Sequence, residues 1–441
     1  MGRTCVPLEI CESVIDHCRS PDVGDGDACV ESRDVLRACC LTCQEWLPRA
    51  RFRLYETLVL QDSDQVNMLL ATFTTHPFLA DHVHALVIYT PPFTSRYISL
   101  ARRELTSKLR HLRSLTYCGH EWVYPPTCHW RGIIARYPIT KLVLDSHFRR
   151  PIDLFRFIWT FEHLEYLGLH LSRPGLRTSW SHAGFARLGQ LALASRSPQR
   201  RLDLLKVLEI TQLINLPPEL YSTVFGTSVT DFICTGCYDH PFFESWNGIA
   251  ARDYLAQLDQ LRTLTMCVIT TQKHWNRVQA DGTSLQSAVL IPRHIISAIS
   301  ACRNHRDLIC ITVTFGHSTY PNVNDVDDPD DADLDDADHR YALLSRTFGP
   351  VLDHILAGIA SLRELVVNME APYFDGHTSS CWRSWMQDRM PTLKAEIVVN
   401  CKPSPYRNRL LRPSRRLQAA LNGSLGDGNP TSDLPILLHD S

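Results

Sequence analysis

A short apolar pattern that recurs along the chain limits the possible folds more than any other feature of the sequence. An apolar residue is followed after two positions by a second, and after one more position by a third, as in Tyr55, Leu58 and Leu60. The middle positions of the ten instances are Leu58, Leu86, Leu115, Leu142, Leu167, Leu208, Phe232, Leu264, Ile311 and Leu365. The first four intervals are 28, 29, 27 and 25 residues, which is close to the repeat length of one class of solenoid. The later intervals are longer and uneven.

Each unit of this pattern predicts a short strand followed by a helix. Residues 62–73 illustrate the helical half, because polar capping candidates precede Val66, Leu69, Leu70 and Phe73 on one face. The segment Ile152–Trp159 is a second example. A single unit cannot bury its apolar face, so neighbouring units must stack and their strands must form one parallel sheet. Three apolar positions also recur by chance in a long chain, and it is the regular early spacing that favours repeats.

The segment before the first repeat has a helical pattern instead. Pro7 stands where a helix should begin, because proline has a helical φ and loses no hydrogen bond in the first turn. The following apolar residues, Ile10, Val14, Ile15 and Cys18, are expected to lie along one face, and Pro21 to end the helix. A second stripe comprises Leu36, Cys39, Cys40, Cys43, Trp46 and Leu47. About 45 residues bury little core by themselves, so these stripes must pack on each other or on a partner.

This N-terminal segment resembles the F-box, in particular that of fungal F-box proteins. The residues that carry the resemblance are Pro7, Leu8, Glu9, Ile10, Ile15, Leu36, Arg37, Leu41, Cys43, Trp46, Arg49 and Arg51. The resemblance implies a three-helix module that docks on a Skp-type adaptor of a cullin-based ubiquitin ligase. The residues that it assigns to the adaptor contact are Pro7, Leu8, Ile10, Ile15, Leu36, Leu41, Cys43 and Trp46. The chain departs from the family at Asp22–Arg33, an acidic insertion where a short turn is usual.

The repeats in turn resemble leucine-rich repeats, although loosely. The asparagine expected after the last apolar position is missing, and Leu213 stands in that place in the unit of Leu205. The predicted fold class is α/β, with an F-box-like helical module at 5–54 and an irregular leucine-rich-repeat-like solenoid with a parallel sheet at 55–400. An acidic disordered loop is expected at 322–338. A basic and then disordered tail at 401–441 is expected to cap the last repeat before it frays.

The pairing of the two resemblances implies a non-catalytic substrate receptor of a Skp–cullin–F-box ubiquitin ligase. No motif of a hydrolase, a nucleotide-binding loop or a zinc protease occurs in the sequence. The substrate is expected on the outward strand positions Val143, Glu209, Ile233, Thr265, Thr312 and Val366. The alternative is a repeat scaffold for protein–protein interaction in which the N-terminal helices only cap the open end of the solenoid.

Cysteine and aspartate clusters raise the question of metal sites, and we expect none. Cys40 and Cys43 lie on the apolar stripe, where cysteine acts as a small hydrophobe, and the Cys234/Cys237 pair has no second pair nearby. Cys118, His120, Cys128 and His129 follow no zinc-binding spacing. The nine aspartates between Asp325 and Asp338 lack the glycine and the glutamate of a calcium loop, so they are expected to be solvated. No cofactor is predicted.

Composition sets the expected compartment and excludes some partners. The 16 cysteines are scattered and no signal peptide or long apolar window precedes them, which predicts a reducing intracellular setting, cytoplasmic or nuclear. The formal net charge of −2 conceals a mildly basic body with one acidic run. That bias is too weak and diffuse to predict binding to nucleic acid. No membrane contact is expected either, because no window of the sequence has the apolar length of a transmembrane helix.

Overall fold

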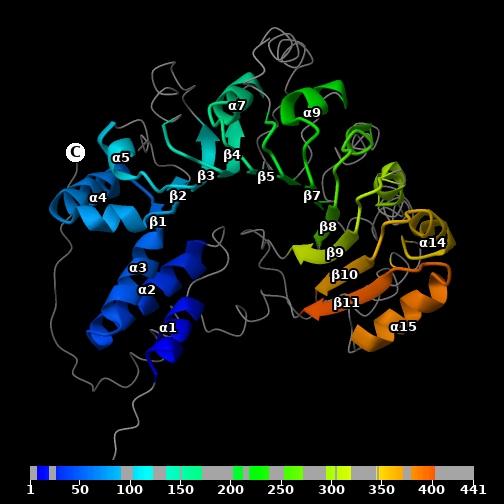
Figure 1. Ribbon diagram of the computed structural model, residues 1–441, viewed down its shortest axis with the longest axis horizontal. Coiled ribbons are helices and arrows are strands. Elements are labelled where there is room, and N and C mark those ends of the chain that lie inside the picture. Colours follow the sequence, from blue (N-terminus) through cyan, green and yellow to red (C-terminus); the bar gives the residue numbers. More distant parts are fainter. Residues whose placement is uncertain are drawn as a thin grey trace, which may run out of the picture.

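An arc of parallel strands with helices along its outer side forms most of this computed structural model (Figure 1). The residues that the structure describes are 7–18, 26–90, 103–122, 136–148, 151–170, 202–211, 218–237, 253–271, 295–302, 305–318, 344, 347–370 and 379–402. Three further helices precede the first strand at one end of the arc. The predicted irregular α/β solenoid with a parallel sheet is therefore confirmed.

The sheet has eleven strands, which pair in chain order and in parallel. They are β1 (Thr57–Leu60), β2 (Ala85–Thr90), β3 (Ser114–Trp122), β4 (Lys141–Phe148), β5 (Tyr166–His170), β6 (Val207–Thr211), β7 (Asp231–Cys237), β8 (Thr263–Thr271), β9 (Cys310–Ser318), β10 (Glu364–Glu370) and β11 (Glu396–Lys402). The ten predicted middle positions occupy a single register row, and Ile397 of β11 adds an eleventh. No side chain of this row is more than 5% exposed.

A backbone hydrogen-bond ladder joins the repeats where the strands begin. The carbonyl of His84 accepts from the N–H groups of both Arg113 and Ser114, at 2.8 and 3.0 Å. The carbonyl of Arg113 in turn accepts from Thr140 and Lys141, and the same pair of bonds recurs from repeat to repeat as far as the carbonyl of Ile309. Because each carbonyl holds two N–H groups of the next repeat, successive strands start in register whatever the length of the connection.

The outer helices cover the buried side of the sheet. They include α4 (Ser63–Thr75), η1 (Pro77–His82), α5 (Arg103–Lys108), α7 (Pro151–Ile158), α9 (Pro218–Phe225), α14 (Pro350–Ala357) and α15 (Ser379–Arg389). The predicted helix in 62–73 is α4, which the side chain of Asp62 caps by accepting the N–H of Gln65 at 2.8 Å. The predicted helix at Ile152–Trp159 is α7. Helix α14 begins at Pro350 after the extended Gly349, because proline suits the first turn of a helix.

The N-terminal helices are α1 (Leu8–His17), α2 (Gly26–Thr42) and α3 (Leu47–Glu56). Two expectations were wrong here. Most of the segment Asp22–Arg33 belongs to α2 and is no insertion loop, since the helix already begins at Gly26. Tyr55 belongs to α3 and not to the first strand, which starts two residues later at Thr57.

The N-terminal helices have a small core of their own, and α3 also packs against the first repeat, where Tyr55 contacts the core of the solenoid. Ile15, Leu36, Cys39 and Ala50 form a buried cluster separate from the core of the solenoid. On the other side of α3, the ring of Phe52 lies 5.4 Å from that of His82 and 6.3 Å from that of His84, measured between centroids. The helices and the solenoid are therefore adjacent but keep distinct cores.

Several sequence expectations fall on residues outside the described ranges. The acidic loop at 322–338 is one of them, and most of the tail is another. Cys401 and Lys402, expected at the start of the tail, are the last two residues of β11. Within the described ranges, no helix has the length and apolarity that a membrane span requires.

Candidate interaction surfaces

Helix α1 is apolar on two faces, and only one of them is buried. Cys11 and Ile15 face α2 and α3, while Leu8, Ile10 and Val14 are 47%, 54% and 52% exposed. The expectation that Ile10, Val14 and Ile15 share one face was wrong. Ile10 and Val14 lie on a side of α1 next to the buried one. The described residues of α2 and α3 leave these two side chains and Leu8 uncovered.

The predicted adaptor residues divide between surface and core. Pro7, Leu8, Ile10, Leu41 and Cys43 are exposed, and Leu41 at the end of α2 is 87% exposed. Ile15 and Leu36 are fully enclosed in the module core, and Trp46 is half-buried against it. Ile15 and Leu36 fix the three helices to one another, and their assignment to the adaptor contact stays a prediction.

Two exposed apolar residues of the module were not among the predicted adaptor residues. Val14 lies four residues after Ile10 and extends its side of α1, and Val35 of α2 is 47% exposed. The i, i+4 spacing of Ile10 and Val14 was visible in the sequence. It did not reveal that this side faces outward, because that depends on where α2 and α3 pack.

Ion pairs hold α1 against α3. The carboxylate of Asp16 accepts from Arg49 at 2.5 and 2.8 Å and from Arg53 at 2.7 Å, and Arg53 also pairs with Glu56 at 2.7 Å. The hydrogen bonds from Arg53 and Arg49 hold the pKa of Asp16 well below its usual range. Asp16 therefore stays ionised at neutral and mildly acidic pH.

The inner face of the arc carries the predicted substrate positions. All six lie in one register row that crosses the whole sheet. From β1 to β11 the row comprises Val59, Val87, Thr116, Val143, Gly168, Glu209, Ile233, Thr265, Thr312, Val366 and Val398. The six predicted residues are half-buried, and Glu209 is the one charged side chain of the row.

A polar cluster surrounds Glu209 at the middle of the row. The hydroxyl of Tyr166 donates to one carboxylate oxygen of Glu209, and His170 Nε2 lies 3.2 Å from the other. Lys141 Nζ lies 4.5 Å above the ring of Tyr166. Burial raises the pKa of Glu209, but His170 and Tyr166 more than offset it, so the pKa lies below its usual value. Strands β4, β5 and β6 are tied together by this cluster, which the sequence did not reveal.

Gly168 gives this cluster room. A Cβ on Gly168 would lie 3.3 Å from Val143 and 3.4 Å from His170 Nε2, which is closer than most side-chain contacts. Because Gly168 has no side chain, the ring of His170 has room to approach Glu209 on the neighbouring strand β6.

The cysteines that raised the question of metal sites are mostly buried or on strands. Cys118 and His120 belong to β3 and not to a loop after it, and Cys118 is buried. Burial raises the pKa of Cys234 to about 12, so its thiol stays protonated at neutral pH. Among the described side chains, no three His, Cys, Asp or Glu residues gather as metal ligands would. Cys128, His129 and Asp325–Asp338 lie outside the described ranges.

Comparison with known proteins finds likenesses among solved structures but no match by sequence. No protein-family model matches the chain, and no curated protein does. A leucine-rich-repeat protein of Legionella pneumophila, LegL7, is similar over 84% of this chain and 99% of its own, with 13% sequence identity and a TM-score of 0.42. The parallel sheet is established independently of that likeness, by the strand order and register of this chain.

Proposed function

We propose that this protein is the substrate-recognition subunit of a Skp–cullin–F-box-type ubiquitin ligase. The N-terminal module would bind the Skp-type adaptor, and the inner face of the solenoid would bind a protein substrate. The observation that carries the proposal is the second apolar face of α1. Leu41 of α2 is exposed as well, so the small module carries apolar side chains on its surface that its own core does not use.

The energetics favour a docking role for this surface. Fully burying a Leu or Ile side chain is worth about 1.5–3 kcal/mol, and these side chains are about half exposed or more. Four of them covered together would supply several kcal/mol toward association, concentrated in a few residues as in other protein interfaces. The surface is distinct from the contact of Phe52 with the first repeat, so an adaptor and the solenoid would not compete for it.

The inner face of the solenoid suits the second half of the role. Its central row is nearly uncharged and continuous across every strand, with the cluster of Tyr166, His170 and Glu209 fixed in the middle. A partner that lies along the row would meet apolar and hydroxyl side chains, and one charged group whose position is set by three strands. Such a surface selects by shape and hydrogen bonding and needs no active site.

The direct test is binding of a purified Skp-type adaptor to the full chain by calorimetry. The double variant Ile10→Asp, Leu41→Asp places charge on the exposed surface without touching the module core. We expect at least a 100-fold loss of affinity, because two desolvated apolar contacts are replaced by buried carboxylates. Circular dichroism should be unchanged.

The matched control is Val351→Asp on α14, a comparably exposed apolar residue at the other end of the solenoid. It should leave adaptor affinity unchanged. Equal affinities of the wild type and the double variant would overturn the role assigned to α1. Absence of any adaptor binding by the wild type would favour the alternative, a non-catalytic repeat scaffold whose N-terminal helices only cap the solenoid.

A further inference from the structure

The first strand of the sheet has one open edge. Strand β1 pairs with β2, and among the described residues no strand lies on its other side. The carbonyl of Glu56 accepts from the N–H of His84, just before β2, at 3.0 Å. Main-chain groups of successive residues in a strand point alternately to its two edges, so those of Thr57 and Val59 are directed away from β2. Such an edge is a template for a further strand.

A groove with a volume of about 470 Å³ lies along this edge. It is lined by residues 58–60 of β1, by Arg33 and Arg37 of α2, and by Met68 of α4, among others. Met68 is 70% exposed, and Val59 is half-buried. The groove therefore combines main-chain groups of an edge strand, an exposed apolar side chain and two guanidinium groups.

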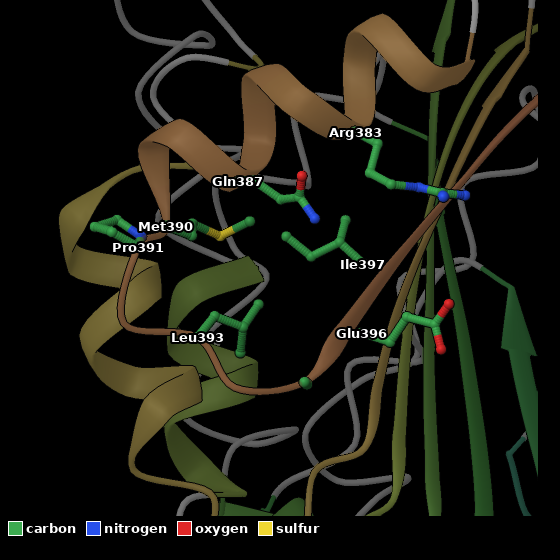
Figure 2. Close-up of a pocket in the computed structure, with 8 residues that line it drawn as sticks. Arg383, Gln387, Met390, Pro391, Leu393, Glu396 and Ile397 are labelled. Atoms are coloured by element: carbon green, nitrogen blue, oxygen red, sulfur yellow. The ribbon is translucent and has the colours of Figure 1, made fainter.

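The groove at the other end of the sheet is different. It has a smaller volume of about 330 Å³, and Met390 and Ile397 lie in it between α15 and β11 (Figure 2). These two side chains are only 2% and 4% exposed, because they already pack in the core of the solenoid. Of the two grooves, the one beside β1 is thus the one that presents a large apolar side chain to a partner.

We propose that β1 accepts an acidic, extended segment of a partner protein as an additional strand. The four residues of β1 span roughly 13 Å, which suits a core of about four partner residues. The backbone of the partner pairs with the outward groups of Thr57 and Val59. One of its apolar side chains covers Met68, whose flexible thioether adapts to different shapes.

The charge of the groove selects an acidic segment over a basic or neutral one. Arg33 and Arg37 are the charged side chains of its lining, and no described carboxylate lines it. Asp34 binds Arg37 at 3.0 Å, but the two side chains are 63% and 59% exposed, so this pair is weak. Each guanidinium group has five N–H donors and can hold a carboxylate of the partner through two parallel hydrogen bonds.

Selection from a display library of random nine-residue peptides on the full chain tests the proposal. The variant Val59→Pro serves as the counter-target, because proline removes the outward N–H of β1 and leaves the bonds to β2 in place. We expect the enriched peptides to alternate β-forming residues with aspartate or glutamate. Synthetic copies should bind Val59→Pro at least tenfold more weakly than the wild type, as measured by fluorescence anisotropy.

A charge exchange provides a second readout. Arg37→Glu should weaken binding of the same peptides at least tenfold, and replacing their acidic residue by lysine should restore part of the affinity. The matched control is Arg383→Glu, which changes an exposed arginine of the groove beside β11 and should leave the affinity unchanged. Binding of the Skp-type adaptor should be the same in Val59→Pro as in the wild type, because Val59 is not among the residues proposed for that contact.

Three results would overturn the proposal. They are no enrichment over the counter-target, enriched peptides without acidic residues, and equal affinities of the peptides for Arg37→Glu and Arg383→Glu. If circular dichroism shows that Val59→Pro does not fold, Met68→Asp replaces it as the counter-target. That variant changes an exposed side chain of the groove and should cause the same tenfold loss.

Discussion

The N-terminal helices and the solenoid are stabilised in opposite ways. The solenoid has one continuous apolar core that runs from Leu58 to Val399. The module has a core of four buried residues and relies on the ion pairs of Asp16 with Arg49 and Arg53 to fix α1 to α3.

The difference in core size bears on the exposed apolar side chains. Ile10 and Leu41 are exposed on the module, because a three-helix unit has little interior to hold them. The solenoid also exposes apolar side chains, such as Met68 of α4 and Val351 of α14, but over a much longer stretch of chain. The short module therefore has the higher density of exposed large apolar residues.

Removal of a large side chain from the solenoid core should have the largest effect. Phe232 is 1% exposed at the centre of the buried row, and its ring lies 6.1 Å from that of Tyr254. Phe232→Ala should lower the free energy of unfolding by about 3–5 kcal/mol in urea titrations, because a cavity replaces the ring. Ile233→Ala, on the outward row, should cost under about 1.5 kcal/mol. If Phe232→Ala accelerated amide exchange in α1–α3 as much as in the solenoid, the two regions would unfold as one unit. That result would contradict their separate stabilisation.

Loss of the Asp16 carboxylate should weaken the module alone. Asp16→Asn should lower its stability by about 1–2 kcal/mol, a value reduced by the partial exposure of the pairs. The native pKa of Asp16 lies below the unfolded value of about 3.9, so its contribution is complete above about pH 4 and is lost as the pH falls further. Exchange in α1 measured at pH 3 and pH 7 should thus differ in the wild type more than in the variant. An equal pH dependence would assign the effect to other groups.

The solenoid contains a comparable carboxylate, and its removal should have a smaller and local effect. Glu209→Gln keeps an acceptor for Tyr166 but loses the charge beside His170, at an expected cost of about 1 kcal/mol. The lowered pKa of Glu209 makes this contribution present above its unfolded pKa and lost on acidification. Thermal unfolding followed against pH should show it, with Tyr166→Phe as the variant that retains the charge. A larger cost than that of Asp16→Asn would reverse the ranking of the two regions.

The smallest effect is expected at Gly168. In Gly168→Ala the new methyl would press on the side chains of Val143 and His170, which can each shift by a few tenths of an ångström. We expect a change in stability of less than about 1 kcal/mol. Displacement of His170 should also raise the pKa of Glu209 toward its usual value, which carboxylate-labelled NMR can follow. No movement of that pKa would mean that His170 keeps its place without the glycine.

Much of the solenoid was predictable because apolar residues recur at the same positions of each strand, so the repeat is visible in the sequence. All ten middle positions found in the sequence share one row of the sheet. The eleventh, Ile397, escaped because Lys394 stands three residues before it, where the pattern requires an apolar side chain, and Leu393 is one position too early. The outward row followed directly from the inward one, since side chains alternate along a strand.

The module was less predictable because its arrangement depends on contacts between distant residues. Asp16 lies 33 positions from Arg49 and 37 from Arg53, and no local spacing relates them. The sequence of α1 offers two apolar faces, and only the packing of α2 and α3 selects the buried one. The cluster of Tyr166 and Glu209 was hidden for the same reason, since a connection of more than 40 residues separates the two.

The ladder at the strand starts has a consequence for how such a chain can change over time. Its donors and acceptors are main-chain groups, so the residues that carry them, from His84 to Ile309, are free to be cationic, anionic or aliphatic. Joining one repeat to the next requires only that the donor residues are not proline, which has no backbone N–H. Whole units can therefore be duplicated or deleted, and their connections lengthened, while the backbone hydrogen-bond ladder is kept. The number of repeats can thus change during evolution.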